Sequence, residues 1–369
     1  MKPKKSNKPP TAIENGDFKS LQEIVLAARR NLSPMDWDHL TGGSDSETTA
    51  KRNRLAFETL ALRQRVLVNV LDVDITTTFL GQELAMPVFI APVGGFVSRG
   101  HPEGAAAVVR AAEAAGTMAI TGQARPGYEI TPKAASYPLV HQLYVDGDRA
   151  WLTDRLDRVK AAGYRALCVT VDRNWYARRE RDLISNFAGR EAEDDPQFQA
   201  SLDWDQVMWI KRYSGLPLIL KGIATAEDAE LAVKHGAAMV YLSNHGGRQL
   251  DQGEGTLDVL PEAVQAVAGK AEIVMDGGVL RGSDVVKALC LGARAVGVGK
   301  LMGYALAAGG QAAITRMLEL LAIEVRMTMG LIGATSLRDL NPSRVKHALA
   351  VGIPTITSAY PWYEEQMRK

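Results

Sequence analysis

The segment SNHGGRQLD (243–251) places a histidine and an arginine in one short loop that contains two glycines. His245 can accept a proton near neutral pH, and Arg248 can hold a carboxylate through two parallel hydrogen bonds. The glycines between them let the backbone fold back without a Cβ clash. The segment therefore predicts a base beside an anion-binding cation, although a capped loop with a surface arginine would have the same residues.

A second segment, VTVDRNWYARRERD (169–182), ends an apolar run at Asp172 and then carries Arg178 and Arg179. A carboxylate at this place is suited to hydrogen-bond the imidazole of His245 and to stabilise its protonated form. Two adjacent arginines need not point the same way. The sequence therefore leaves open which of the two faces a site and which forms a structural ion pair.

Lys221 lies near the end of the apolar run LPLILKGI (216–223). Burying a lysine is costly unless its charge faces an anion or an electron-rich acceptor. Both a Schiff base and stabilisation of negative charge on a cofactor would explain it, and the residues alone do not choose between them.

Two glycine-rich loops, DGGVLRG (276–282) and GVGKLMG (297–303), carry Arg281 and Lys300. Exposed backbone N–H groups together with these charges predict a phosphate site, and ordinary turns are the alternative. No spacing of cysteine and histidine suggests a metal ligand set.

Predicted strands and helices, which must position these residues, alternate regularly along the sequence. Helical patterns at 102–116, 149–163, 225–236 and 282–292 separate apolar, β-branched runs that are continuous rather than alternating, as in buried parallel strands. An α/β (β/α)8 TIM barrel is therefore predicted, with an open doubly wound sheet as the alternative and with the polar site at the carboxyl ends of the strands. The eight predicted strands lie within 87–94, 118–123, 139–145, 166–172, 216–223, 238–245, 272–279 and 295–300.

The rest of the chain is interpreted as elaboration of one barrel domain, residues 15–369, that follows a disordered basic tail, residues 1–14. The connection at about 173–203, after the fourth strand, is long, polar and acidic, which predicts a mobile lid. Additional elements are expected as helices at 18–30, 34–41, 47–58 and 302–332 and as a possible hairpin at 65–84.

Charge and composition limit the classes of partner and the cellular compartments that are expected for this protein. The 369 residues carry 43 Lys and Arg against 42 Asp and Glu, a net charge of +1, which disfavours nucleic acid. We expect no membrane span and no signal peptide, because no apolar run reaches the required length. Cys168 and Cys290 are expected as core residues in a reducing compartment, which predicts a cytoplasmic protein.

Taken together and in order, several motifs resemble the FMN-dependent α-hydroxy acid oxidases and dehydrogenases, a family that includes glycolate oxidase and lactate oxidase. The likeness runs from about residue 20 to about residue 340. It implies FMN as cofactor and oxidation of an (S)-2-hydroxy acid to the 2-oxo acid. Two electrons would pass to flavin N5 and then to O2, giving H2O2, and the protein would be a homotetramer. The motifs are SNHGGRQLD, LPLILKGI, HQLYV, VTVD…RRERD, DGGV and HPEG.

The resemblance also implies roles for single residues. His245 would be the catalytic base with Asp172 as its partner, and Arg248 and Arg179 would bind the substrate carboxylate. Tyr144 would hydrogen-bond the substrate near its reacting oxygen. Lys221 would lie beside flavin N1 and O2. The other residues implied in cofactor binding are Pro92, Val93, Gly94, Thr121, Gln142, Thr170, Ser243, Asp276, Gly278, Arg281, Gly299 and Lys300.

The sequence departs from the family pattern around the substrate. His39 stands where a tyrosine that binds the carboxylate is usual, Gln123 replaces a tryptophan, and Gly94 replaces an alanine common in the oxidases. Leu280 and Lys300 occupy two positions at which the family pattern has arginines that bind the FMN phosphate. The changes at His39, Gln123 and Gly94 predict a 2-hydroxy acid larger or more polar than glycolate or lactate.

Three other functions are compatible with parts of this pattern. The first is a dehydrogenase of the same family that passes electrons to a quinone or a protein. The second is a non-redox flavin isomerase such as type 2 isopentenyl diphosphate isomerase, against which the pairing of His245 with Arg248 argues. The third is a catalytically silent flavin-binding protein, which the presence of the full set of polar residues disfavours.

Overall fold

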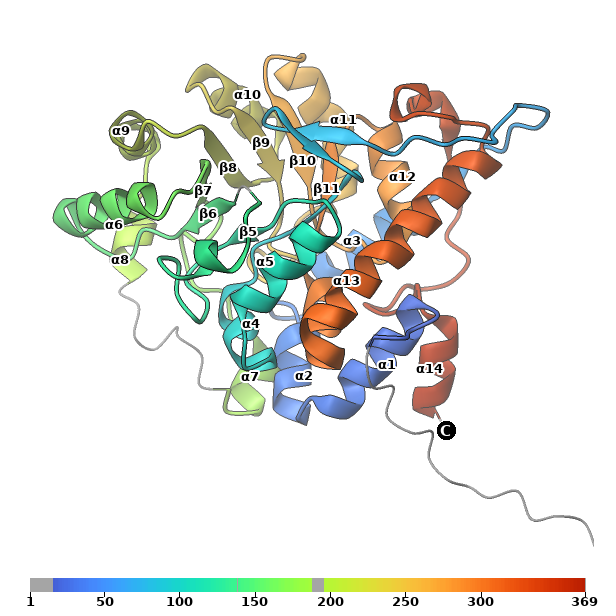
Figure 1. Ribbon diagram of the computed structural model, residues 1–369, viewed down its shortest axis with the longest axis horizontal. Helices are drawn as coiled ribbons and strands as arrows, with labels where there is room; N and C mark the ends of the chain where they lie inside the picture. The colour runs from blue at the N-terminus through green and yellow to red at the C-terminus, as the bar shows by residue number, and fades with distance from the viewer. Residues whose placement is uncertain (1–15, 138, 188–195, 369) are drawn as a thin grey trace, which may run out of the picture.

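Eight parallel strands form the centre of the computed structural model, which describes residues 16–137, 139–187 and 196–368. The sheet order is β4-β11-β10-β9-β8-β7-β6-β5, and a parallel bridge between Ile90 and Ala119 joins its two edges. The ring confirms the predicted (β/α)8 barrel (Figure 1). Its strands are β4 Val88–Ile90, β5 Ile120–Thr121, β6 Val140–Leu143, β7 Ala166–Thr170, β8 Leu218–Ile223, β9 Met239–Leu242, β10 Glu272–Met275 and β11 Ala295–Val298.

Helices surround the barrel and connect its strands. The four helices predicted between strands are found as α5 Ala105–Ala114, α6 Arg149–Ala161, α10 Ala226–Lys234 and α12 Gly282–Cys290. Strands β4 to β11 are buried along nearly their whole length, which explains why their sequences are continuously apolar. The other helices of the ring are α9 Trp204–Ser214, α11 Thr256–Val267 and the first part of α13 Lys300–Leu331.

A hairpin of β2 Thr77–Phe79 and β3 Gln82–Leu84 covers the end of the barrel at which the strands begin. Phe79 and Leu84 pack with inward-facing barrel residues, and Phe89 and Tyr241 belong to the same cluster. The backbone N–H of Leu80 donates to Glu272, the first residue of β10. Because this end is filled, a cavity can form only at the opposite end, where the strands finish.

The N-terminal helices α1 Leu21–Asn31, α2 Pro34–Thr41 and α3 Thr48–Glu58 agree with the predicted ranges. α1 packs along α13 and against α14 Pro361–Arg368 on one flank of the molecule (Figure 1). By length and composition α13 could span a membrane. Many of its residues are buried against α1, α5 and α12 instead, which suits a helix of a folded core.

One expectation needs correction, and the structure adds detail to another. The hairpin predicted over 65–84 covers only 77–84, since residues 65–76 form no strand. The connection at 173–203 contains two short helices, α7 Glu180–Ile184 and α8 Pro196–Ala200. Gln199 of α8 is buried and hydrogen-bonded to the backbone of Val145 and Thr170, which ties this end of the connection to the barrel. Residues 188–195 of the predicted lid and the predicted tail, residues 1–14, lie outside the described residues.

α13 is interrupted at two adjacent glycines. Gly310 has φ +58° and ψ −138°, a conformation open essentially to glycine alone, and an added Cβ would lie 2.6 Å from the His101 ring. Gly309 has φ 177°, which any residue can adopt, and the nearest atom to an added Cβ is 3.3 Å away.

We therefore expect Gly310→Ala to lower the free energy of unfolding by roughly 1–3 kcal/mol. Gly309→Ala should change it much less. Urea unfolding of both variants, followed by circular dichroism, measures the difference. Equal effects of the two substitutions would contradict this account of the interruption.

Candidate active site

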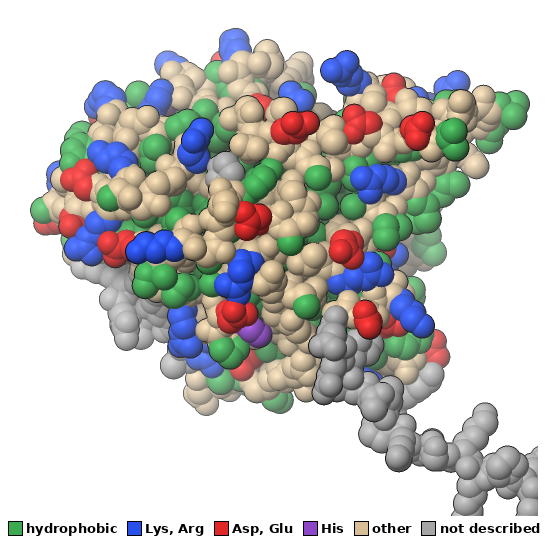
Figure 2. Space-filling model, in the orientation of Figure 1, with side chains coloured by type: hydrophobic (Ala, Val, Ile, Leu, Met, Phe, Trp, Pro, Cys, Tyr) green, Lys and Arg blue, Asp and Glu red, His purple; other side chains and the backbone are tan. Residues whose placement is uncertain are grey.

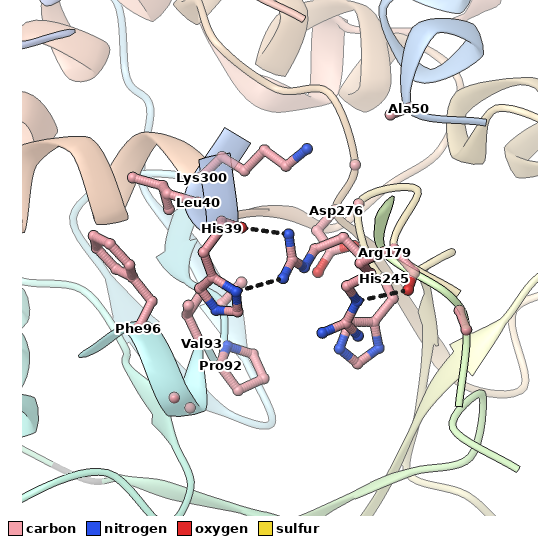
Figure 3. A pocket seen from close by; sticks show the side chains of 18 of the residues that line it. His39, Leu40, Ala50, Pro92, Val93, Phe96, Arg179, His245, Asp276 and Lys300 are labelled. Carbon is pink, nitrogen blue, oxygen red and sulfur yellow. Dashed lines mark hydrogen bonds between the residues drawn. The ribbon is translucent and has the colours of Figure 1, made fainter. Parts of the chain in front are cut away.

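A cavity of about 590 Å³ opens at the carboxyl ends of the strands. It lies within the size range of cofactor and ligand sites. Residues of α2, α4 Gly94–Gly100 and the segment before α7 complete its wall (Figure 3). The predicted site residues that line it are His39, Pro92, Val93, Gly94, Gln123, Gln142, Tyr144, Arg179, Lys221, His245, Arg248, Asp276, Gly278, Gly299 and Lys300.

His245 and Asp172 meet although 73 residues separate them in the chain. Nδ1 of His245 lies 3.1 Å from Oδ1 of Asp172, and Nε2 lies 3.4 Å from the hydroxyl of Tyr144. Burial lowers the pKa of His245 more than Asp172 raises it, so the imidazole is neutral at pH 7. A neutral ring that donates from Nδ1 has Nε2 as its acceptor. The arrangement therefore provides a base whose lone pair is directed into the cavity.

Two glycines permit this approach. Gly222 has φ +106°, and an added Cβ there would lie 2.6 Å from the Asp172 side chain. Gly247 has φ +75°, and its Cβ would lie 2.4 Å from the backbone nitrogen of Ala50. The first glycine makes room for the carboxylate next to β8. The second lets the loop after β9 pack onto α3.

Arg248 and Arg179 approach the cavity from the same side as α2. Arg248 donates to the backbone oxygens of His39 and Gly42, and its guanidinium lies 3.8 Å from Asp182. Arg179 donates to the backbone oxygen of Arg248 at 3.2 Å and to the Gln249 side chain at 3.3 Å. The two guanidinium groups thus form one positively charged wall. Figure 3 shows Arg179 beside the ring of His245.

His39 belongs to this wall as well. Its Nδ1 lies 3.0 Å from Oδ2 of Asp182, and its ring stacks on Phe187 with centroids 3.8 Å apart and an interplanar angle of 6°. Burial lowers the pKa of His39 although Asp182 opposes the shift. The ring is therefore held in place from two sides and is neutral at pH 7.

Lys221 lies at the floor of the cavity. Its Nζ donates to the Ser243 hydroxyl at 2.9 Å and lies 3.8 Å from Oδ2 of Asp276. Burial alone would lower the pKa of Lys221, but the carboxylates of Asp276 and Asp172 outweigh it and raise the pKa. The ammonium group stays charged, which favours stabilisation of negative charge over Schiff-base chemistry.

Several of the predicted site residues do not line the cavity. Asp172, Thr170 and Ser243 contact lining residues through hydrogen bonds but do not line the cavity, and Thr121 does not line it either. Arg281 is turned away, because its guanidinium pairs with Glu324 at 2.8 Å and its backbone N–H with Asp284. The structure thus does not bring Arg281 to the cavity.

Several residues that line the cavity are not predicted by the sequence patterns. Arg54 is buried, forms an ion pair of 2.7 Å with Asp284 and reaches the cavity near Gly278. It lies in a helix rich in charged residues, so its sequence context carries no signal. The further missed residues include Arg99, Arg173, Tyr176, Asp182 and Phe187. Of these, Arg173, Tyr176 and Asp182 lie in the connection that follows β7 on the cavity side, and this position is a signal that the sequence offers.

The contact of His245 with Asp172 can be tested by histidine NMR on labelled protein. Because Asp172 raises the pKa of His245 against burial, Asp172→Asn should lower that pKa further. Asp182→Asn is the matched control, since it should lower the pKa of His39 and leave His245 unchanged. An unchanged or raised pKa of His245 in Asp172→Asn would show that the contact does not form in solution.

Comparisons with known proteins agree with this site. A family model described as FMN-dependent dehydrogenase matches residues 28–347. An L-lactate oxidase of Nostoc sp. (strain PCC 7120 / SAG 25.82 / UTEX 2576) is 38% identical over 354 residues, which cover 88% of this chain and 97% of that protein. A glycolate oxidase of Spinacia oleracea is 36% identical, with 89% and 96% covered.

Among solved structures, mandelate oxidase with (S)-2-phenylpropionate is similar, with a TM-score of 0.83 and 38% identity. The match covers 91% of this chain and the whole of that chain. The family match and the curated relatives each extend over most of the sequence. The chain therefore belongs to the FMN-dependent dehydrogenase family and is an enzyme that uses FMN.

Proposed function

We propose that this protein oxidises an (S)-2-hydroxy acid to the corresponding 2-oxo acid, and that O2 receives the two electrons to give H2O2. The observation that supports this most strongly is the convergence of a neutral base, His245, with the cationic wall of Arg179 and Arg248 in one cavity. A 2-hydroxy acid requires both, since its carboxylate must be held while its hydroxyl loses a proton.

The residues of the cavity fit FMN. An added Cβ at Gly94 or Gly95 would meet no other atom within 4 Å, so the wall beside Pro92 is open enough for a flat ring. Gly277 and Gly278 follow each other with φ +102° and +75°, and both line the cavity without a side chain. We propose that this pair, Lys300 and Arg54 hold the phosphate and that Lys221 faces the ring.

FMN, when bound, supplies a two-electron acceptor next to the substrate carbon. The protein's own residues do the rest. Arg179 and Arg248 hold the carboxylate, and His39 replaces a tyrosine at the same wall. The hydroxyl of Tyr144 and Nε2 of His245 lie 3.4 Å apart, so one substrate hydroxyl beside the pair can be within hydrogen-bond reach of both, to be oriented and deprotonated. Asp172 then stabilises the imidazolium that forms.

We further propose a cytoplasmic homo-oligomer, a tetramer, that binds neither nucleic acid nor a membrane. Large apolar side chains at Leu67, Leu71, Val351 and Ile353 are almost fully exposed, which supports burial against another copy. Cys168 and Cys290 are buried and free, which suits a reducing compartment. Basic and acidic side chains are interspersed on the face in Figure 2, without a large basic area there.

We also propose that residues 15–369 form one domain. One hydrophobic cluster extends from Phe18 in the N-terminal region to Tyr363 in α14 and includes residues of the barrel strands, which supports this proposal. The lid function of the connection at 173–203 remains a prediction.

The phosphate contact gives a pH-dependent prediction. Burial, followed by the nearby Arg248, lowers the pKa of Lys300 to about 7. A bound phosphate favours the charged amine, so FMN affinity should be highest below this pKa and should fall as the pH rises above it, by up to about tenfold per pH unit. Quenching of FMN fluorescence by the apoprotein, between about pH 7 and about pH 8.5, measures this.

Lys300→Arg should flatten the slope, because the guanidinium stays charged. Riboflavin, which has no phosphate, should bind with no such slope in either protein. A pH profile of FMN binding that is the same in Lys300→Arg and in the natural protein would place the phosphate elsewhere.

The reaction itself is tested with a panel of 2-hydroxy acids under anaerobic conditions. We expect (S)-enantiomers to bleach the flavin. For acids larger or more polar than lactate, the limiting reduction rate divided by the apparent Kd should be on the order of tenfold higher. On admission of air, reoxidation should yield one H2O2 per 2-oxo acid. Fastest reduction by glycolate or lactate would contradict the altered pocket, and reoxidation by a quinone but not by air would favour a dehydrogenase.

A further inference from the structure

The tautomer of His39 is fixed by the groups around its ring. Nδ1 lies 3.0 Å from Oδ2 of Asp182 and 3.4 Å from a guanidinium nitrogen of Arg248. Burial raises the pKa of Asp182, but the hydrogen bond with His39 and the charges nearby outweigh burial and lower the pKa, so the carboxylate is ionised at pH 7. A lone pair on Nδ1 would be repelled by this carboxylate. The neutral ring therefore carries its proton on Nδ1 and its lone pair on Nε2.

Nε2 is the nitrogen of His39 that remains for a ligand. His39 lines the cavity, and Nε2 has no hydrogen-bond partner among residues 16–137, 139–187 and 196–368. The guanidinium of Arg248, which is proposed to hold the substrate carboxylate, donates to the backbone oxygen of His39 and lies next to its ring. A carboxylate bound by Arg248 therefore comes close to a ring whose remaining nitrogen offers a lone pair instead of a donor, and two lone pairs repel each other.

A rotation of the ring does not relieve this conflict. Phe187 stacks on His39 with centroids 3.8 Å apart and an interplanar angle of 6°, which holds the plane of the ring. A rotation that moved Nδ1 away from Asp182 would take a hydrogen bond from a largely buried carboxylate, whose side chain is 12% exposed. Addition of a proton to Nε2 keeps both the stacking and the hydrogen bond to Asp182, and it turns the lone pair into a donor.

We propose that binding of the substrate carboxylate draws one proton from water or buffer onto Nε2 of His39. The lone pair of Nε2 forms the new N–H bond, the bond between the proton and its donor breaks, and no electrons pass to or from the flavin in this step. The imidazolium then donates to the carboxylate from Nε2 and to Asp182 from Nδ1. Asp182 is a positioning residue, since it fixes the tautomer. This inference rests on the proposed function, because it concerns the carboxylate of the same 2-hydroxy acid.

Charged groups on several elements act on this proton. In the free protein, burial lowers the pKa of His39, the hydrogen bond with Asp182 raises it, and Arg248 and Arg179 lower it, with a net decrease. A bound carboxylate adds a second negative charge beside the ring and raises the pKa. The other charged or titratable groups of this wall, of α2 and of the elements packed against α2 include Asp36, Asp38, Arg99, Glu180, Arg181, His245 and Lys300.

The sign of the pH dependence follows from the pKa of His39 in the free protein and in the complex. Below the pKa of the free protein, the ring is already protonated and the affinity for a carboxylate is highest. As the pH rises above this pKa, the affinity falls by up to about tenfold per pH unit until the higher pKa of the complex is passed. Between the two values, binding takes up about one proton per site.

Titration calorimetry of the holoenzyme with 2-oxovalerate measures this uptake without turnover. Experiments in two buffers of different ionisation enthalpy, at several pH values between about pH 6 and about pH 8, give the number of protons bound. We expect the natural protein to take up between about half a proton and about one proton more than His39→Gln at the pH of largest uptake. The difference isolates His39 from His245, which lines the same cavity and is present in both proteins.

Asp182→Asn tests the fixed tautomer directly. An amide can donate to Nδ1, so the neutral ring can carry its proton on Nε2 and bind the carboxylate without uptake. We expect this variant to bind 2-oxovalerate and to lose most of the proton uptake attributed to His39. His39→Tyr should do the same, because a hydroxyl donates in its neutral form. If Asp182 only maintained the shape of the wall, its loss would weaken binding at every pH and leave the number of protons unchanged.

His235→Gln is the matched control. Nδ1 of His235 also has a hydrogen-bond partner, the backbone oxygen of Leu231 at 2.8 Å, and its ring stacks on Trp204 with centroids 4.6 Å apart, but it lies at the end of α10 outside the cavity. This substitution should leave the uptake unchanged. Equal uptake in the natural protein and in His39→Gln, or full uptake in Asp182→Asn, would overturn the inference while 2-oxovalerate still binds. Absence of binding at every pH would instead contradict the cationic wall, and the proposed function would fail together with this inference.

Discussion

The backbone carbonyl groups at the end of α2 hold two cations of the cavity close together. The oxygen of Gly42 accepts a hydrogen bond from Lys300 at 3.1 Å and another from Arg248 at 3.0 Å. The last carbonyls of a helix lack partners within the helix and carry partial negative charge, so they can bind cations without a carboxylate. One short helix end therefore positions both the proposed phosphate contact and the proposed carboxylate contact, and His39 lies on the same helix.

The protein environment shifts the pKa values of two neighbouring groups of the site in opposite directions. His245 loses charge because a single carboxylate, Asp172, does not offset the cost of burying an imidazolium. Lys221 keeps its charge because Asp276 and Asp172 both act on it. The ordinary pKa of a lysine already lies well above that of a histidine, and the opposite shifts widen this difference, so the site holds a neutral base beside a lasting cation. Proton removal and stabilisation of negative charge can then take place in one cavity at one pH.

Several residues on one wall of the cavity contact one another. Phe187 stacks on His39, and Asp182 lies against Nδ1 of the same ring. Arg99 in turn lies 4.6 Å from the ring of Phe187. A rigid imidazole and additional arginines make this wall polar and positively charged. These contacts fit the proposal that the substrate is larger or more polar than glycolate or lactate.

The sequence by itself determined the barrel, because buried parallel strands leave a local apolar pattern, and it determined the residue types of the site, because polar groups interrupt that pattern at strand ends. Only the tertiary structure decided which side chains meet. Arg281 pairs with Glu324 whereas Arg54, from a helix more than 200 residues earlier, reaches the cavity. The stacking of Phe187 on His39 likewise corresponds to no pattern in the sequence around either residue. Such contacts depend on packing between segments distant in sequence, and no local pattern encodes them.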